Sequence, residues 1–384
     1  MEHLNEDSHE AKELKIAFIN GVNTAFGGSG ANANRTWFAS LDRVADALTV
    51  IDTVPRCGLR TKGYLLKLLL ALYFLPGTLF RASRVPAAEF FYKLSPLLAL
   101  KLWRRLSQAR PDVVIWSHHS MFIYSLLTPF SRRVFLVQDL LYIRARSFGY
   151  SRRLCKWVFG LECAFYGRAS SLMVLSENEY KILRRFVSRP TALISCLDDR
   201  VFAGATSDPE VKGVALISDW RRSENLHGVI QFLSSRAAMA APPDALPHIA
   251  VYGLGIDNLQ MELKRSGLAA RCVFEYRGVY GQLGEVREST FLVPIYQGAG
   301  IKLKVLEAFA NGRYVLGTKA AFAGLRPARL RGICGLVEEP SAIVASEPQG
   351  SWVREAFAKY YLGRFEDIGQ TVLRLHVPQS TGAV

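Results

Sequence analysis

The stretch that decides the fold is Phe291-Leu-Val-Pro-Ile-Tyr-Gln-Gly-Ala-Gly-Ile-Lys-Leu-Lys-Val-Leu-Glu-Ala-Phe-Ala-Asn-Gly-Arg-Tyr-Val-Leu-Gly-Thr318. Residues 289–293, which end in the apolar run Phe-Leu-Val, predict a strand, and a loop with two glycines follows it. Helical spacing begins near Leu303 and stops at Asn311-Gly312, where a glycine can end the helix. A second strand, expected at 314–317, completes a strand-helix-strand unit, which is the building block of a parallel sheet.

The glycine loop opens this helix, so its chemistry indicates an anionic ligand. Backbone N–H groups and the positive end of the helix would face that ligand, and Lys302 and Lys304 add full charges. Glu307 lies one turn further along, where its carboxylate can accept hydrogen bonds from vicinal hydroxyls such as those of a ribose. These residues predict a site for a nucleotide-like ligand; a solvated helix start with chance glycines is the alternative.

The same alternation of strand and helix recurs along the chain. Further strands are expected at 14–20, 111–116, 133–138, 171–175, 214–217, 248–252 and 273–276. Helical patterns, such as the one from Asn34 to Leu48, separate them. The alternation predicts an α/β protein with doubly wound, Rossmann-like parallel sheets, in which functional side chains collect at the carboxyl ends of the strands.

Small and polar residues at 203–210 interrupt the pattern and predict a linker between two domains. We expect a flexible N-terminal tail at 1–13, a first domain at 14–204, a second at 205–365, and a C-terminal tail at 366–384 that can pack back on the first domain. The loops of both domains would then face a ligand site between them.

The charge of the chain indicates an anionic partner. Lys and Arg number 48 against 33 Asp and Glu, and the net charge of +15 divides into +12 for residues 1–200 and +3 for the rest. Residues 51–110 hold 11 basic side chains, only two acidic ones (Asp52 and Glu89), and many apolar residues. Charge mixed with apolar residues favours an anionic membrane surface. Nucleic acid is the disfavoured alternative, because no zinc spacing, RNA-recognition motif or basic region with heptads occurs.

The run from Tyr64 to Phe80 is the most apolar segment of residues 51–110. It is shorter than a membrane span, contains Lys67 and is interrupted by Pro76-Gly77, so we expect an amphipathic helix that lies in the membrane interface. A core helix of the first domain is the alternative. Trp103 with Arg104 and Arg105 fits an interfacial anchor or an ordinary surface turn.

The six cysteines are widely spread and form no Cys-x-x-Cys pair, which favours reduced core residues and a cytosolic setting. The N-terminus lacks the pattern of a secretory signal. We therefore expect a cytoplasmic protein, peripheral on the inner face of the cell membrane.

Beyond these physical arguments, the chain resembles a known family. The stretch 289–325 is similar to the donor-site motif of the group 1, family-4-like retaining glycosyltransferases of the GT-B fold, in the branch that reads Pro-x-x-x-Gly-Ala-Gly-x-Lys/Arg-x-Lys-x-Leu-Glu-Ala. Weaker matches extend the resemblance over residues 14–365: the glycine loop at Gly27 to Gly30, His118-His119, Asp139, Ser176-Glu177-x-Glu179, Arg221-Arg222 before Asn225, and Gly253-x-Gly255.

The resemblance implies two Rossmann-like domains around a central cleft, and a role for each matching residue. Gly298, Gly300 and Lys302 would meet a nucleotide-sugar donor, and Glu307 would meet its ribose. Arg221 or Arg222 would meet its diphosphate, His118 the transferred sugar, and Gly28 would let the backbone approach the donor from the opposite wall. His118, Lys302 and Arg221 are the expected catalytic group. No cofactor is implied, since the nucleotide sugar is a co-substrate, and no metal, since the chain has no Asp-x-Asp triplet.

The implied activity is transfer of a sugar, with retention, to a lipid-linked, glycolipid or polysaccharide acceptor at the cytosolic membrane face. The chain departs from many relatives at Ala299, where they have a Glu, and Arg221-Arg222 only partly matches their Arg-x-x-x-Lys-Gly pair. A catalytically silent scaffold of the same fold, or a nucleotide-sugar epimerase, therefore stays an alternative.

Three assignments also remain open in the first domain. His119 competes with His118 for the inward position. Asp139 is either an acceptor-side polar group or a helix N-cap. Glu177 and Glu179 fit caps of the helix after Ser176 better than catalytic groups.

Overall fold

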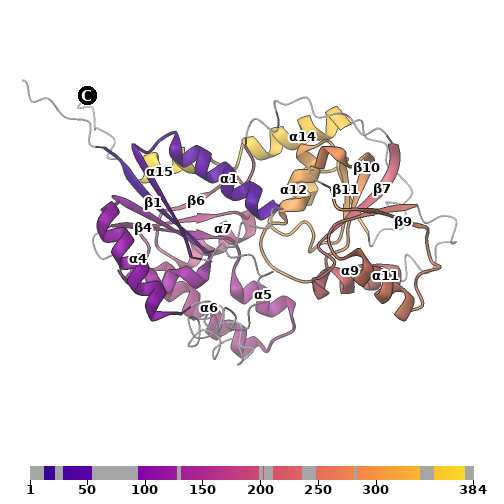
Figure 1. Cartoon of the computed structure of the whole chain (residues 1–384), viewed down its shortest axis with the longest axis horizontal. Helices are drawn as coiled ribbons and strands as arrows, with labels where there is room; N and C mark the ends of the chain where they lie inside the picture. Colours follow the sequence, from indigo (N-terminus) through magenta and orange to yellow (C-terminus); the bar gives the residue numbers. More distant parts are fainter. Residues whose placement is uncertain are drawn as a thin grey trace, which may run out of the picture.

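Buried apolar strands alternate with amphipathic helices to build two parallel sheets, one in each half of the chain (Figure 1). The computed structural model describes residues 13–21, 29–53, 94–127, 131–198, 202, 211–235, 248–280, 283–337 and 350–376. The run at 64–80, Gly28 and the linker at 203–210 were singled out in the sequence and lie outside these ranges.

The first sheet has six strands in the order β2-β1-β3-β4-β5-β6, all parallel. Its strands are β1 (Lys15–Asn20), β2 (Ala47–Asp52), β3 (Val113–Ser117), β4 (Arg132–Val137), β5 (Ser171–Val174) and β6 (Thr191–Leu193). Its helices are α1 (Ser29–Asp42), α4 (Pro96–Ala109), α5 (Leu141–Ser147), α6 (Arg152–Tyr166) and α7 (Glu177–Phe186), with a 3₁₀ helix η2 (His119–Leu127) after β3.

The second sheet has the order β12-β11-β10-β7-β8-β9 and is also parallel throughout. Its strands are β7 (Val211–Ile217), β8 (Ile249–Tyr252), β9 (Phe274–Gly278), β10 (Glu288–Val293), β11 (Tyr314–Gly317) and β12 (Cys334–Leu336). Its helices are α9 (Ser223–Leu233), α11 (Ile256–Arg265), α12 (Leu303–Ala310) and α14 (Gly350–Leu362), with 3₁₀ turns η4 (Leu283–Glu285) and η5 (Pro327–Arg329). Helix α15 (Ile368–His376) follows α14.

The strands expected from the sequence are confirmed to within a few residues, and α12 begins and ends where it was predicted. The helix expected from Asn34 to Leu48 is wrong at its end: α1 stops at Asp42, and residues 47–52 form β2. Only Ile51 of β2 is buried, because β2 is an edge strand, so no alternating pattern marks it. β6 and β12 have three residues each, too few to show a period.

The strand order places a topological switch point in each sheet. The chain runs outward in opposite directions from the pair β1 and β3, and from the pair β7 and β10, so the loops after these strands separate and leave space for a ligand. In the first sheet this point lies at Gly21 and His118, which are so close that a Cβ on Gly21 would lie 2.9 Å from the Cβ of His118.

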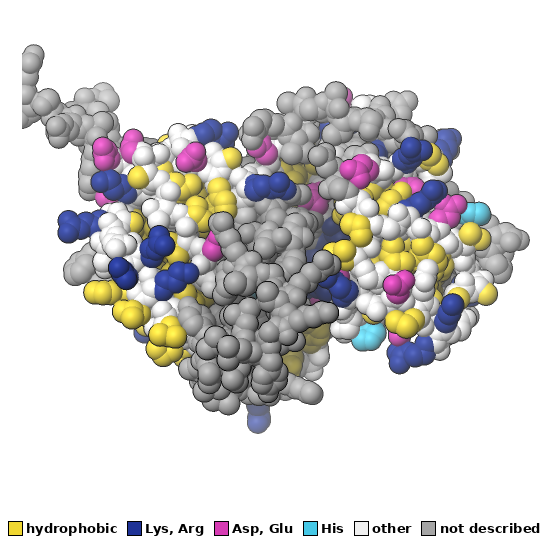
Figure 2. Space-filling view, viewed as in Figure 1, with side chains coloured by type: hydrophobic (Ala, Val, Ile, Leu, Met, Phe, Trp, Pro, Cys, Tyr) yellow, Lys and Arg dark blue, Asp and Glu magenta, His cyan; other side chains and the backbone are white. Residues whose placement is uncertain are grey.

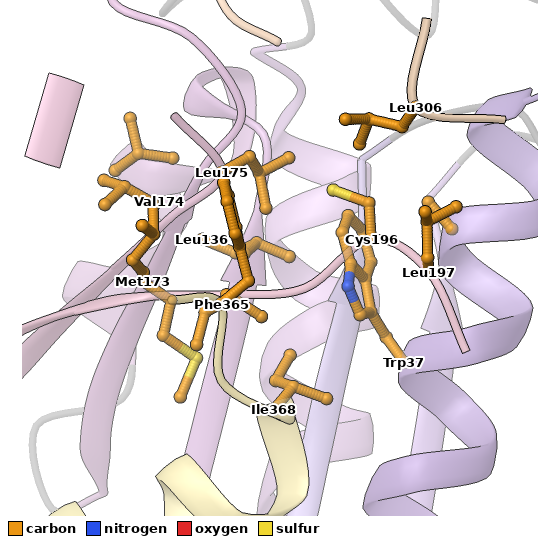
Figure 3. Packing of buried hydrophobic residues seen from close by; sticks show 14 of the residues in the cluster. Trp37, Leu136, Met173, Val174, Leu175, Cys196, Leu197, Leu306, Phe365 and Ile368 are labelled. Carbon is orange, nitrogen blue, oxygen red and sulfur yellow. The ribbon is translucent and has the colours of Figure 1, made fainter. Parts of the chain in front are cut away.

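The hydrophobic core continues from one half of the chain to the other. Figure 3 shows Leu306 of α12 beside Cys196 and Trp37 of the first half. The Trp37 indole N–H donates to the Ser195 carbonyl (2.7 Å), and the Cys196 N–H donates to the Tyr361 hydroxyl of α14 (2.8 Å). This contact, apolar packing with two hydrogen bonds, fixes one side of the junction between the halves.

The end of the chain returns to the first sheet, where α15 lies beside α1 (Figure 1). The Ser40 hydroxyl donates to the Asp367 carboxylate (2.6 Å) and accepts from the Gly369 N–H (3.0 Å). His376 is bonded to the buried Ser171 hydroxyl (2.9 Å), and burial lowers the pKa of this histidine to about 4. The C-terminal segment therefore ties the second half back onto the first.

The described cysteines (Cys155, Cys163, Cys196, Cys272 and Cys334) are free thiols, in line with the expected role as small core residues. None of the helices within the described ranges is long and apolar enough to cross a membrane.

A buried carboxylate, Glu177, links the halves at the start of α7. It forms ion pairs with Arg326 and Arg364 and accepts a hydrogen bond from the Tyr360 hydroxyl (2.6 Å). The Glu177 N–H also donates to the Gly324 carbonyl (3.1 Å). This carboxylate was expected to cap α7, but the cap is Ser176, and Glu177 binds side chains of the second half instead.

Replacing Glu177 should therefore weaken the junction more than replacing an exposed acid. Glu177→Ala leaves Arg326 and Arg364 without their shared partner and should cost about 2–3 kcal/mol of unfolding free energy. The matched control is Glu275→Ala, which breaks the exposed pair with Arg277 and should cost under about 1 kcal/mol. Calorimetric unfolding measures both; equal costs would contradict a structural role for Glu177.

Candidate functional site

The glycine loop after β10 lies against the end of β4 and against α5 of the first half. Gly298 and Gly300 have φ of 120° and 69°, which side-chain-bearing residues rarely adopt. A Cβ on Gly300 would lie 2.8 Å from the Gln138 carbonyl oxygen and 2.9 Å from the Asp139 Cβ. The Gly298 N–H donates to the Ser147 hydroxyl of α5 (3.0 Å). Only glycine at 300 lets the loop lie against the end of β4.

Lys302 forms the start of α12 and folds back over the loop. Its ammonium donates to the carbonyls of Ala299 (2.6 Å) and Gly300 (3.3 Å). Burial lowers the pKa of Lys302; the carboxyls of Asp139 and Glu179 oppose this shift, and the charges of Arg144 and Arg222 add to it. The loop thus holds one cation by its carbonyls, next to charges from both halves.

Lys304 is the second cation of α12 and is held by the end of β7. Its ammonium donates to the Ser218 hydroxyl (2.8 Å) and to the Ile217 carbonyl (3.4 Å). Burial, together with the positive charges of Arg222 and Lys302, lowers the pKa of Lys304 to about 8. A bound anion would favour the charged form of this lysine.

The two arginines before α9 are both exposed and pair with different carboxylates. The Arg221 guanidinium is paired with Asp219 through two contacts of 2.7 Å. Arg222 is paired with Glu224, and its charge acts on the pKa of both Lys302 and Lys304. The charge of Arg222, which lies beside α9, is thus within electrostatic range of the lysines of α12.

Glu307 lies one helical turn beyond Lys302, half-buried in α12. Burial raises the pKa of Tyr280 to about 12, and the Glu307 charge adds to that shift. Glu307 likewise adds to the rise that burial causes in the pKa of Cys196. Gly28, expected on the opposite wall, lies outside the described residues.

The two histidines after β3 have different environments. His119 is buried, at 2% exposure, and its Nδ1 lies 3.8 Å from the Asp139 carboxylate. His118 is half-buried and has φ of 76°, a strained conformation of the kind that persists at functional positions. Its Nδ1 is bonded to the Ser120 hydroxyl (2.8 Å) and accepts from the Ser120 N–H (3.2 Å). Of the two, His118 is the more accessible.

Three carboxyls surround the start of α5. Glu162 accepts from the N–H groups of Leu141 (2.7 Å) and Tyr142 (3.1 Å), and Glu179 accepts from that of Leu140 (3.0 Å). Asp139 is paired with Arg144. Asp139 is thus not a helix N-cap, since Leu140 holds that position, and Glu179 holds α5 rather than capping α7.

Two residues of α5 that contact or adjoin the glycine loop were missed in the sequence: Arg144 and Ser147. Ser218, the partner of Lys304, was missed as well. Arg144 could have been noticed as a basic residue shortly after Asp139, which follows a strand. Nothing in the sequence, however, shows that α5 reaches the second half. Among the described residues, no group of three or more His, Cys, Asp or Glu side chains could hold a metal ion.

Comparisons with known proteins identify the architecture. No family model matches the chain, and no curated protein sequence is similar to it. Solved structures do match. Sucrose-phosphate synthase from Thermosynechococcus elongatus has a TM-score of 0.59 at 15% identity, covering 94% of this chain and 97% of that one. The chain has the GT-B fold.

Two further glycosyltransferase-fold structures agree with this assignment. HepE from Anabaena, solved with UDP-glucose, has a TM-score of 0.58 at 15% identity, covering 94% of this chain and 98% of that one. WaaG, a glycosyltransferase involved in lipopolysaccharide biosynthesis, has a TM-score of 0.57 at 14% identity, covering 95% and 100%. The matches thus extend over both sheets.

The protonation of Glu179 should make stability depend on pH. Burial, with the nearby Asp139 charge, raises the pKa of Glu179 from 4.5 to about 8, so the folded chain binds more protons than the unfolded chain between these values. This contribution to stability is complete below pH 4.5 and is lost as pH rises through 8.

Glu179→Gln removes that titration. Its unfolding free energy should therefore fall less than that of the wild type between about pH 5 and about pH 9, as denaturant titrations can measure. Glu355→Gln, at an exposed position of α14, is the control and should keep the wild-type slope. An unchanged slope in Glu179→Gln would show that this carboxyl is ionised in the folded chain.

Proposed function

We propose that the protein is a glycosyltransferase that binds a nucleotide-sugar donor at the switch point of the second sheet. The observation that supports this most is the gathering of Lys302, Lys304 and Arg222 around the loops after β7 and β10 in a GT-B fold. Like charges repel when they are brought together in a partly buried place, so this arrangement favours binding of an anion.

Each residue has a proposed role in the reaction. Lys302 and Arg222 bind the donor diphosphate, and Gly298 and Gly300 let the backbone approach it. Glu307 binds the ribose, and His118 contacts the transferred sugar. Arg221, which is paired with Asp219, contributes less than Arg222 to binding of the diphosphate. Gly28 keeps the role implied by the resemblance, in which it lets the backbone approach the donor. Ala299, where many relatives have a Glu, contributes no charge to the sugar site.

Positive charge fixed beside the diphosphate stabilises the leaving group as the bond to the sugar breaks. We propose a retaining transfer in which the acceptor attacks on the leaving side and the departing diphosphate takes its proton. No metal is required in this scheme, because the lysines and Arg222 supply the charge.

The proposed acceptor is a lipid-linked, glycolipid or polysaccharide chain at the cytosolic membrane face. The outer face of α4 supports a membrane contact: Leu97 and Leu100 are 60% exposed and Trp103 is 55% exposed, next to Arg104 and Arg105. Figure 2 shows hydrophobic and basic side chains side by side in this region, at the lower left. Trp103 lies within a helix, so the sequence alternative of a surface turn is wrong.

A catalytically silent scaffold is the second candidate, and one observation favours it. The Gly298 N–H donates to the Ser147 hydroxyl, and the Lys302 ammonium donates to the Ala299 carbonyl of its own loop. These donors therefore have hydrogen-bond partners without a ligand. A nucleotide-sugar epimerase would differ from both by turning over without an acceptor.

The donor site makes a direct binding prediction. Lys302→Ala and Glu307→Ala should each weaken nucleoside-diphosphate binding by about 1.5–3 kcal/mol, since each removes a charge-assisted contact. Titration calorimetry with UDP, GDP and ADP measures this, and Lys264→Ala, an exposed lysine at the end of α11, is the control. Unchanged affinity in folded Lys302 and Glu307 variants would remove both residues from the site.

The proposed role of the cations also predicts that sugar transfer persists in a chelator. Release of nucleoside diphosphate from a radiolabelled nucleotide sugar should be the same with and without EDTA. Complete loss that Mg²⁺ restores would show that the lysines and Arg222 do not suffice for the leaving group.

Membrane binding should depend on both kinds of side chain on α4. Each cation near an anionic surface contributes about 1 kcal/mol, which salt screens, while apolar side chains add a part that salt does not remove. Arg104→Gln with Arg105→Gln should reduce cosedimentation with anionic liposomes at low salt, and Leu100→Ser with Trp103→Ser should reduce what remains at high salt.

The control for the membrane experiment replaces equally exposed apolar residues of the second half, Met261 and Val279, by Ser. This control should sediment as the wild type does. If all variants sediment equally, α4 is not the membrane contact.

A further inference from the structure

Helix α5 is the element of the first half that reaches the glycine loop, and it is held at both ends. Its first N–H groups are bound by the buried carboxyl of Glu162, and the N–H just before the helix by that of Glu179. At its other end, the Ser147 hydroxyl accepts from the Gly298 N–H (3.0 Å). A helix fixed in this way can present a side chain at a defined place.

Arg144 is that side chain. Its Nε lies 3.1 Å from a carboxylate oxygen of Asp139, and its Nη2 binds the same oxygen. Asp139 itself packs against Gly300, where there is no room for a Cβ. The guanidinium is therefore held beside the glycine loop of the second half.

The charge of Arg144 affects the pKa values of groups in the second half. It contributes to the lowered pKa of Lys302 in α12. Burial raises the pKa of Glu224 in α9, but hydrogen bonds and the charges of Arg222 and Arg144 outweigh that rise and leave the pKa below its usual value. Arg144 is thus in electrostatic range of the same groups that surround the proposed diphosphate site.

The cations at this place outnumber the carboxylates that pair with them. Arg144, Arg222, Lys302 and Lys304 come from both halves and face the carboxylates of Asp139 and Glu224. Burial, with the nearby Asp139 charge, raises the pKa of Glu179 to about 8, so this carboxyl contributes less negative charge than an exposed Glu would. The remaining positive charge matches a diphosphate, whose oxygens fit the planar fork of an arginine.

We propose that Arg144 binds the donor diphosphate from the side of the first sheet, so that the donor bridges both halves of the molecule. This inference rests on the proposed function and adds a binding residue from the opposite half. Asp139 holds the guanidinium in place, and Lys302 and Arg222 bind the diphosphate from the second half. Because the contact exists only when the halves are together, donor binding favours the closed arrangement.

The test compares Arg144→Gln and Arg144→Lys with Arg146→Gln, a matched control on the exposed face of the same helix. The probe is whichever of UDP, GDP and ADP the wild type binds most tightly, measured by titration calorimetry. Arg144→Gln should weaken binding roughly tenfold to hundredfold. Arg144→Lys should keep part of the affinity, because it keeps the charge but loses the fork. Arg146→Gln should bind as the wild type does.

Hydrogen exchange separates direct contact from a merely structural role. The nucleotide should slow amide exchange in α12 and in α5 of the wild type and of Arg146→Gln. In Arg144→Gln it should slow exchange in α12 alone. Asp139→Asn keeps the cation but loosens its anchor, so it should lose less affinity than Arg144→Gln.

Two results would overturn the proposal: wild-type affinity with α5 protection in Arg144→Gln, or losses of affinity in Asp139→Asn and Arg144→Lys as large as the loss in Arg144→Gln. In both cases Lys302→Ala still weakens binding, and the proposed donor site stands. Failure of the wild type to bind any of the three nucleotides would instead remove the donor site itself.

Discussion

The close approach of the loop at Gly300 to the end of β4 is the constraint on which the candidate site depends. A Cβ at this glycine would lie within 3 Å of Gln138 and Asp139, so a larger residue would push the halves apart. Because the loop lies against Asp139, the cations of α12 meet Arg144, which comes from a helix more than 150 residues earlier in the chain. The charge distribution at the junction follows from this backbone contact.

The same closeness explains why the ionisable groups there have shifted pKa values. Burial penalises charge, so Glu162 and Glu179 are raised to about 8 and Lys304 is lowered to about 8, while Lys302 is also lowered. Burial makes the charged forms of these lysines less favourable in the ligand-free site. A bound anion would stabilise the charged forms.

The two sides of the junction differ in kind. On one side, Leu306, Cys196 and Trp37 form an apolar contact, and α15 ties the chain end to α1. On the other, hydrogen bonds and charges predominate, such as the bond from Gly298 to Ser147. Apolar packing tolerates little displacement, whereas single hydrogen bonds can exchange for water or ligand. The apolar side therefore constrains the arrangement of the halves more than the polar side does.

Hydrophobic periodicity and the glycine loop at 298–300 were enough to predict an α/β chain with two parallel sheets and the position of α12. These features are local: a strand, a loop and a helix each leave a pattern within a few residues, and parallel sheets place their strand ends at one edge. The edge strand β2 left no such pattern, which is why the helix α1 was predicted to extend too far. The short strands β6 and β12 left no such pattern either.

The tertiary structure alone decided which charged groups meet. Arg221 and Arg222 are equivalent neighbours in the sequence, yet Arg221 pairs with Asp219 and Arg222 pairs with Glu224. Glu177 and Glu179 read as caps of one helix, but one binds Arg326 and Arg364 and the other holds α5. Arg144 carried no motif at all. Contacts between distant segments depend on how the two sheets pack, and no spacing along the chain records that packing.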